Sequence, residues 1–88
     1  MLLAVDIGNT RISFAVFDSG KLRAHWNEAS RTDKSAQAYY RGLKKKLAGF
    51  GIGLKSVTGV IICSVVDELN PVFKKLSTDN FYKNKEGV

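Results

Sequence analysis

Runs of hydrophobic residues, first continuous and then alternating, predict three strands at the start of the chain. Residues 2–7 are apolar almost throughout, which is typical of a central strand covered on both faces. Residues 11–18 alternate imperfectly between apolar and polar positions, residues 22–29 alternate better, and the turn sequence 18–21 separates them. Ile12, Phe14 and Val16 are expected to share one face of the first of these strands, and Leu22, Ala24 and Trp26 one face of the next. The pattern therefore predicts an antiparallel meander of three strands.

Apolar residues then recur at helical spacing after a polar connection. The predicted stripe consists of Ala36, Tyr39, Tyr40, Leu43, Leu47 and Phe50. Ser35, or Thr32 upstream, can cap this helix, and Gly49 or Gly51 can end it. A β-branched run over residues 57–66 predicts a fourth strand, and the helix before it forms a crossover that favours a parallel arrangement.

A second helix is predicted after the fourth strand, with Asp67 or Asn70 as its cap and Pro71 in its first turn. Its apolar stripe consists of Leu69, Val72, Phe73 and Leu76. Residues 79–88 have no clear pattern and are expected to be an irregular tail, in which Phe81 to Lys85 is a weak candidate for a fifth strand. The order β-β-β-α-β-α predicts one α/β domain over residues 1–88 with a mixed sheet.

The turn between the first two strands carries an acid, a glycine, an amide and a hydroxyl within Asp6-Ile7-Gly8-Asn9-Thr10. Gly8 can adopt a positive φ and lets a ligand approach the backbone closely. Backbone N–H groups of a tight turn can form an anion site, to which Asn9 and Thr10 add side-chain donors. A carboxylate at Asp6 would repel a phosphate unless a hard cation such as Mg²⁺ lay between them. The turn therefore indicates a phosphate site with a metal ion, and the alternative is a plain two-residue hairpin loop.

Three stretches of the chain resemble type III pantothenate kinases, which belong to the acetate kinase, sugar kinase, Hsp70 and actin superfamily. Leu3 to Thr10 (LAVDIGNT) resembles the first phosphate motif of this family. Leu22 to Trp26 (LRAHW), followed by Arg31-Thr32-Asp33, is similar to the family's third strand and the loop after it. Val60 to Val66 (VIICSVV) resembles a later strand of the family. The resemblance covers residues 2–76, with the motifs in the family's order.

The resemblance implies a ribonuclease H-like fold, as in the nucleotide-binding half-domains of actin-like ATPases. It implies that Asp6 positions Mg²⁺ and that Gly8, Asn9 and Thr10 contact the phosphates of ATP. The implied phosphate-binding loop consists of Asp6, Ile7, Gly8, Asn9, Thr10, Arg11, Ile12 and Ser13. Members of the family transfer the γ-phosphate of ATP to pantothenate, the first step of coenzyme A synthesis, and use Mg²⁺ and a monovalent cation, K⁺ or NH₄⁺. The complete enzyme is expected to be a cytoplasmic homodimer that binds pantothenate near the subunit interface.

Several motifs of the family do not occur in these 88 residues. The Gly-x-Asp-Arg tetrad that supplies the family's catalytic aspartate is absent, so no catalytic residue is assigned. The second phosphate motif, the adenosine contacts and the cation site also lie further along in the family, and the family's proline after Ser-Val-Val is Asp67 here. Phosphoryl transfer depends on positioning and charge neutralisation by all of these parts. We therefore expect the N-terminal part of a kinase that does not turn over pantothenate alone.

Composition and charge change this picture little. Hydrophobic residues make up 44% of the chain and charged residues 25%, as in ordinary globular domains. No apolar run approaches the length of a membrane span, and the N-terminus lacks the pattern of a signal peptide. Because Cys63 is the single cysteine, there is no internal disulfide, and the cytoplasm is the expected compartment. The net charge of +6 favours anionic partners such as a nucleotide, a nucleic acid or an acidic protein.

Two alternatives to a kinase are open. The first is a non-catalytic regulatory module, because some members of this family have been labelled accessory transcription factors. Lys44-Lys45-Lys46 lacks the interleaved aromatic residues of a single-strand-binding site and is better explained as a solvated helix face, so nucleic acid is not the expected partner. The second is a fragment without function, whose sheet ends at an uncovered edge strand. Gly49 to Gly53 is interpreted as a helix stop, Cys63 as a core or strand-end cysteine, and His25 as a surface residue.

Overall fold

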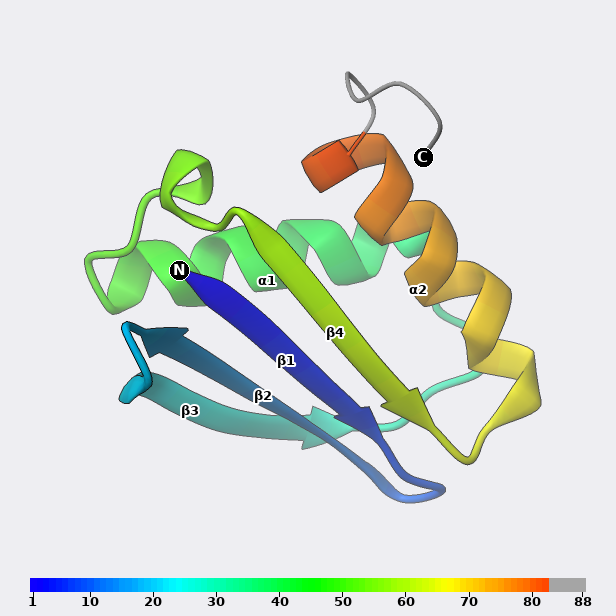
Figure 1. Cartoon of the computed structure of the whole chain (residues 1–88). Coiled ribbons are helices and arrows are strands. Elements are labelled where there is room, and N and C mark those ends of the chain that lie inside the picture. The colour runs from blue at the N-terminus through cyan, green and yellow to red at the C-terminus, as the bar shows by residue number, and fades with distance from the viewer. Residues whose placement is uncertain (83–88) are drawn as a thin grey trace.

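A mixed four-stranded sheet lies at the centre of the protein, with the strand order β3-β2-β1-β4 (Figure 1). A computed structural model of the chain describes residues 1–82. The strands are β1 (Leu2–Ile7), β2 (Arg11–Asp18), β3 (Lys21–Ala29) and β4 (Gly59–Ser64). Strand β2 pairs antiparallel with both β1 and β3, and β4 pairs in parallel with β1. The predicted meander and the parallel fourth strand are confirmed.

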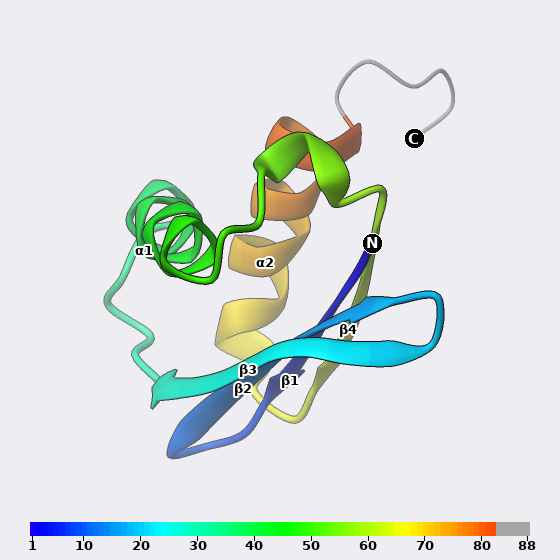
Figure 2. The ribbon, with the colours of Figure 1, turned by 90° about the vertical axis from the view of Figure 1, so that its left-hand side faces the viewer.

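Both α-helices pack on the same face of this sheet (Figure 2). They are α1 (Ala36–Gly49) and α2 (Asn70–Ser77), with the short turns η1 (Leu54–Ser56), η2 (Asp67–Leu69) and η3 (Thr78–Tyr82). No helix of residues 1–82 lies on the opposite face, which we call the open face. The prediction that the first strand is covered on both faces is therefore wrong. Leu2 and Ala4 are apolar, but an apolar side chain does not by itself require burial.

The core lies between the sheet and the two helices. The sheet contributes Leu3, Val5, Ile7, Ile12, Phe14, Val16, Ala24 and Trp26, and the helices contribute Tyr39, Leu43, Leu47, Phe73 and Leu76. Phe14 stacks on Trp26 with their ring centroids 5.1 Å apart, and Tyr39 contacts Phe73 at 4.9 Å. The predicted stripes of both helices are thus confirmed, although Phe50 is 44% exposed where it stacks on Trp26 at the end of α1.

The ends of α1 follow its sequence signals. The Ser35 side chain accepts a hydrogen bond from the Ala38 N–H at 3.1 Å, as expected of an N-cap. At the other end Gly51 has a φ of +74° and donates its N–H to the Ala48 C=O, while the Ile52 N–H donates to the Leu47 C=O. This pair of bonds is a Schellman motif, which needs a glycine at the left-handed position. The interpretation of Gly49 to Gly53 as a helix stop is confirmed.

Helix α2 begins without the predicted side-chain cap. Its N-cap is Leu69, and neither Asp67 nor Asn70 caps the helix. The helical turn η2 runs directly into α2, and Leu69 itself has helical dihedral angles. The chain therefore has no extended residue at this point from which a side chain could cap the next turn. Pro71 lies in the first turn, as predicted.

A β-bulge overturns the expected position of Leu22. Val16 pairs with Ala24, but the next residue, Phe17, pairs with Leu22, so that Arg23 is the extra residue of the bulge. Ala24 and Trp26 remain in the core, whereas Leu22 is 58% exposed beside Phe17. The alternation of apolar and polar residues does not predict this shift. The extra residue of a bulge changes which face the side chains before it point to, relative to those after it.

The prediction of an irregular tail is wrong for residues 79–82. Thr78 to Tyr82 continues α2 as the π-helical turn η3, so residues 79–82 are neither irregular nor a strand. The Asn80 side-chain amide donates to the Leu76 C=O at 2.9 Å, and Lys75 pairs with Asp79 at 3.0 Å. These local bonds extend the helix past its apolar stripe. The remainder of the tail, including Lys83 to Lys85, lies outside the described residues.

Candidate functional site

The turn between β1 and β2 lies where the two parallel strands of the sheet end. Ile7 pairs with Ile12 of β2 on one side and with Ser64 of β4 on the other. The N–H of Val65 donates to the C=O of Ile7 at 3.0 Å and joins the two carboxyl ends. In open α/β sheets, ligands bind outside the carboxyl ends of the strands. The predicted phosphate turn therefore lies beyond the carboxyl ends of the parallel strands, where a ligand is expected.

The backbone of this turn approaches itself closely at Gly8. Its N–H donates to the C=O of Arg11 at 2.9 Å, and a Cβ at Gly8 would lie 3.0 Å from the same oxygen. Gly8 does not use the positive φ that a glycine allows, since among residues 1–82 the positive values occur at Ser19, Gly20 and Gly51. Glycine is favoured here by close approach of the backbone rather than by a left-handed conformation.

Asn9 and Thr10 form the exposed tip of the turn. The N–H of Ser30 donates to the C=O of Thr10 at 3.1 Å, which ties the tip to the residue after β3. No hydrogen bond or ion pair engages the side chains of Asn9, Thr10 or Arg11 within the described part of the chain. The carboxylate of Asp6 is also exposed. Four polar side chains around one turn are therefore available to a ligand.

Other residues of the predicted loop hold it in place. Ile7 and Ile12 are fully buried, so their side chains anchor the turn in the core and do not reach a ligand. Ser13 lies within β2, opposite Asp6, and its hydroxyl donates to the Oδ1 of Asn27 at 2.7 Å. Sequence reasoning missed Asn27, which directly follows the buried Trp26 in β3 and therefore faces away from the core. The serine and its partner extend the polar site from the turn onto the open face.

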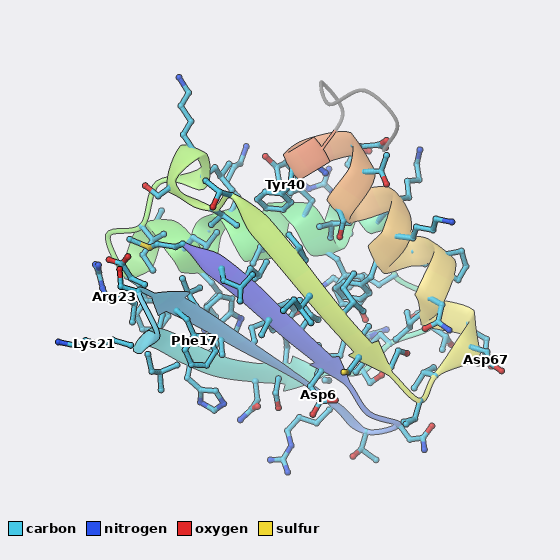
Figure 3. The ribbon with its side chains drawn as sticks, viewed as in Figure 1. Asp6, Phe17, Lys21, Arg23, Tyr40 and Asp67 are labelled. Carbon is cyan, nitrogen blue, oxygen red and sulfur yellow. The ribbon has the colours of Figure 1, made fainter. Side chains whose placement is uncertain are left out.

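A shallow hollow of about 400 Å³ covers part of this open face. Its lining includes Asp6, Ser13, Phe17, His25 and Cys63, with Asp6 beside the turn and Phe17 toward the far end (Figure 3). Within residues 1–82, no three acidic, histidine or cysteine side chains form a group that could hold a metal ion. A hard cation at Asp6 would therefore take its other ligands from phosphate oxygens and water, a donor set that suits Mg²⁺.

The segment after β4 borders the same end of the sheet. The hydroxyl of Ser64 bonds both the N–H and the C=O of Val66 at 3.1 Å, which fixes the bend that follows the strand. Val65 is 73% exposed at this bend. Asp67, the residue at the family's proline position, lies at the same end of the sheet as Asp6 (Figure 3). Because Asp6 and Asp67 are far apart in the sequence, the sequence alone does not predict that they lie at the same end of the sheet.

The connection between β3 and α1 is fastened by Tyr39. Its hydroxyl donates to the C=O of Arg31 at 2.8 Å and accepts from the N–H of Arg31 at 2.9 Å. Burial raises the pKa of the Tyr39 phenol above its ordinary value. The Arg31 guanidinium, bonded to the Asp33 carboxylate at 3.0 Å, lowers the pKa of that exposed carboxyl. The stretch Arg31-Thr32-Asp33, which resembles the family, therefore has a structural role: its bonds to Tyr39 attach α1 to the end of β3.

The remaining candidates lie outside the turn itself. Lys44, Lys45 and Lys46 are exposed on α1, with the Lys44 ammonium 5.6 Å from the Tyr40 ring centroid, as expected of a solvated helix face. Cys63 is exposed at the end of β4, so it is a strand-end and not a core cysteine. His25 is on the surface, as predicted. Cys63 and His25 line the open-face hollow together with Asp6, whereas the three lysines of α1 do not line it.

The mixed sheet, its crossover helix and the turn at the carboxyl end of β1 define an actin-like ATPase half-domain. A family model described as type III pantothenate kinase matches residues 2–85. The chain therefore belongs to the type III pantothenate kinase family.

Three curated relatives, each named type III pantothenate kinase, show the extent of the match. The protein of Moorella thermoacetica is 38% identical over 78 residues, which cover 89% of this chain and 31% of the relative. The protein of Brevibacillus brevis is 34% identical over 76 residues, 86% of this chain and 30% of the relative. The protein of Caulobacter vibrioides is 34% identical over 86 residues, 98% of this chain and 32% of the relative. The chain thus spans about a third of the length of the relatives it matches.

The helices of residues 1–82 are short. The longest, α1, has 14 residues, whereas a helix needs about 20 apolar residues to cross a bilayer. None is long and apolar enough to do so.

Proposed function

We propose that this chain is the ATP phosphate-binding part of a type III pantothenate kinase, an enzyme that transfers the γ-phosphate of ATP to pantothenate. The Gly8 turn is the observation that carries the proposal. Its backbone is so tightly folded that a side chain at Gly8 would crowd the Arg11 carbonyl, and its tip presents the free polar side chains of Asn9 and Thr10. Such a turn beside paired carboxyl ends of strands suits a phosphate group.

Each residue of the turn has a distinct role in this proposal. The backbone around Gly8, with the Asn9 amide and the Thr10 hydroxyl, binds phosphate oxygens. Asp6 holds Mg²⁺ on the open-face side of the turn, and the bound ion neutralises phosphate charge. Arg11 adds an exposed positive charge at the start of β2. The buried pair Ile7 and Ile12 keeps the turn in register, so that these groups need little reorganisation when a ligand binds.

The complete reaction needs parts that these 88 residues do not contain. We propose that the remainder of the kinase supplies the catalytic aspartate, the pantothenate site, and the site for K⁺ or NH₄⁺. The complete enzyme would act as a cytoplasmic homodimer in the first step of coenzyme A synthesis. This chain alone binds Mg-ATP weakly and does not phosphorylate pantothenate.

A titration of the ¹⁵N-labelled chain with Mg-ATP, followed by heteronuclear NMR, tests the proposal. We expect chemical-shift changes centred on the amides of Gly8, Asn9 and Thr10. Asp6→Ala and Gly8→Val should abolish these changes, and Asn9→Ala should weaken binding about tenfold, or about 1.4 kcal/mol, by removing one donor from an exposed position. The Asn9 side chain is exposed and makes no hydrogen bond within the described residues, so this variant separates binding from stability.

Lys45→Ala is the matched control, because Lys45 is an exposed cation on α1, away from the turn. It should leave the Mg-ATP titration unchanged. A folded chain whose turn amides do not respond to Mg-ATP would refute the proposal. Shifts that spread over Lys44 to Lys46, and that disappear steeply as salt rises, would instead indicate the regulatory module that binds an anionic partner through charge.

A further inference from the structure

A row of three polar side chains crosses the open face beside the phosphate turn. Asp6 of β1 pairs with Ser13 of β2, and Ser13 pairs with Asn27 of β3. The residue before each of the three is buried in the core, so all three side chains point to the open face. Side chains that are directly opposite in antiparallel strands have Cβ atoms about 4.5–5.5 Å apart. The row therefore places a hydroxyl between a carboxylate and an amide.

The hydroxyl of Ser13 is bonded to one of these two neighbours. It donates its single proton to the Oδ1 of Asn27 at 2.7 Å. No hydrogen bond or ion pair engages the Asp6 carboxylate within residues 1–82. Because a charged acceptor makes a stronger hydrogen bond than a neutral one, the hydroxyl would donate to Asp6 if the amide were absent. Asn27 therefore holds the Ser13 proton away from the carboxylate.

The direction of this bond decides what the row can bind. A serine hydroxyl has one proton and two lone pairs, and an ionised carboxylate has lone pairs alone. With its proton committed to Asn27, the Ser13 oxygen offers only lone pairs toward Asp6. Two acceptors then lie side by side without a donor between them. Such a pair suits a cation, or a molecule that presents hydrogen-bond donors alone.

A partly hydrated Mg²⁺ has both properties. The ion dehydrates reluctantly and usually keeps several waters when one or two carboxylates hold it. Because the oxygen of each bound water faces the ion, the water presents only its hydrogens to the protein. With Mg²⁺ on Asp6, the Ser13 oxygen can accept a hydrogen bond from one of these waters. Residues that hydrogen-bond the ligands of a metal commonly set its affinity as well as its position.

We propose that Asn27 is a positioning residue for Mg²⁺ at the proposed ATP site. By accepting the Ser13 proton, it leaves the Asp6 carboxylate free for the ion and makes the Ser13 oxygen an acceptor for a water on that ion. Asn27 belongs to β3, so it acts from outside the phosphate loop. The inference rests on the proposed function, since it requires Mg²⁺ at Asp6, but it can fail while that function stands.

The contribution of the metal to ATP binding tests this inference. We define the metal enhancement as the affinity of the chain for ATP in saturating Mg²⁺ divided by its affinity in EDTA, both read from the amide shifts of Gly8, Asn9 and Thr10. Asn27→Ala should reduce the metal enhancement about fivefold, the loss of one hydrogen bond of about 1 kcal/mol. It should not weaken binding in EDTA. A merely structural role would lower both affinities alike, because it would disturb the turn itself.

A double-mutant cycle shows whether Asn27 acts through Ser13. Ser13→Ala removes the acceptor itself and should reduce the metal enhancement by about the same factor as Asn27→Ala. The double variant should match Ser13→Ala, whereas independent effects would multiply to about 25-fold. Asn27→Asp keeps an acceptor for the Ser13 proton, and its charge attracts the ion, so this variant should retain or raise the metal enhancement.

Arg23→Ala is the matched control. It removes another exposed side-chain contact between β2 and β3, the 3.4 Å ion pair of Arg23 with Asp18. Arg23 lies toward the opposite end of the sheet from Asp6 (Figure 3). The control should therefore leave the metal enhancement unchanged. Because the Ser13–Asn27 bond is also exposed, every variant should retain the native amide spectrum.

Three results would overturn the inference. They are an unchanged metal enhancement in Asn27→Ala, effects of the two alanine variants that multiply, and an Asn27→Asp protein that is as impaired as Asn27→Ala. In each case, wild-type shifts at Gly8 to Thr10 with Mg-ATP would leave the proposed function intact. A folded wild-type chain whose turn amides do not respond to Mg-ATP would refute the proposed function, and this inference with it.

Discussion

Substitution of Gly8 by alanine tests the physical basis of the turn. The new Cβ would lie 3.0 Å from the Arg11 carbonyl oxygen, closer than carbon atoms of this kind normally approach an oxygen. The carbonyl must retreat by a few tenths of an ångström, which stretches the 2.9 Å hydrogen bond from the Gly8 N–H. Loss of that bond costs about 0.5–1.5 kcal/mol, and residual overpacking adds about 1 kcal/mol.

One effect opposes this loss. Alanine restricts the unfolded chain more than glycine does, which stabilises the folded state by about 0.4–1 kcal/mol where the conformation is compatible. The net change expected for Gly8→Ala is a destabilisation of about 1 kcal/mol. For a domain of this size the melting temperature should therefore fall by about 4–8 °C.

Gly42→Ala is the matched control. Gly42 lies inside α1, and apart from the adjoining residues and the backbone of its own helix a Cβ there would meet no heavy atom within 4 Å. Because alanine has the higher helix propensity, the same chemical change should stabilise the protein by about 0.5–1 kcal/mol. Thermal unfolding followed by circular dichroism should show shifts of opposite sign for the two variants. A Gly8→Ala protein that melts at or above the wild-type temperature would refute the close-approach argument.

Three further predictions concern packing and pH. Tyr39→Phe should lower the free energy of unfolding, measured in urea titrations, by about 1–3 kcal/mol, because it leaves the N–H and C=O of Arg31 without their partner. An unchanged urea midpoint would contradict the role of the Tyr39 hydroxyl in stability. Burial raises the pKa of the Tyr39 phenol above its usual 10.0, so the unfolded state loses the phenol proton at a lower pH than the folded state does. The stability that the protonated Tyr39 contributes is therefore fully present below about pH 10 and is lost as the pH rises through the pKa of the folded state. The difference between wild type and Tyr39→Phe should shrink over that range, and a constant difference would argue against the shift. Ser77→Ala should leave the free chain as stable or raise its stability by about 1 kcal/mol, because it removes a buried hydroxyl without a partner; a clear loss of stability would show that the hydroxyl is satisfied.

The predictable parts of the fold are those with strong local signals. The alternation of β2, the Ser35 cap and the glycine at the end of α1 each act through neighbouring residues, so the sequence determined them directly. The turn at Gly8 was also recognisable, because it lies between two clearly patterned strands, whereas phosphate binding there stays a prediction. Its residues are close in sequence, and a hairpin brings them together whatever the rest of the fold does.

The tertiary structure decided what depends on distant contacts or on an inserted residue. The bulge beside Phe17 moved Leu22 to the open face, and η2 removed the need for a cap on α2. Ser13 found Asn27 only because β2 and β3 pair in one register. The placement of both helices on one face left Leu2 36% exposed, and the strand order made β4 an outermost strand among the described residues. Local sequence specifies elements and their ends, whereas the face that an element buries follows from how the elements pack together.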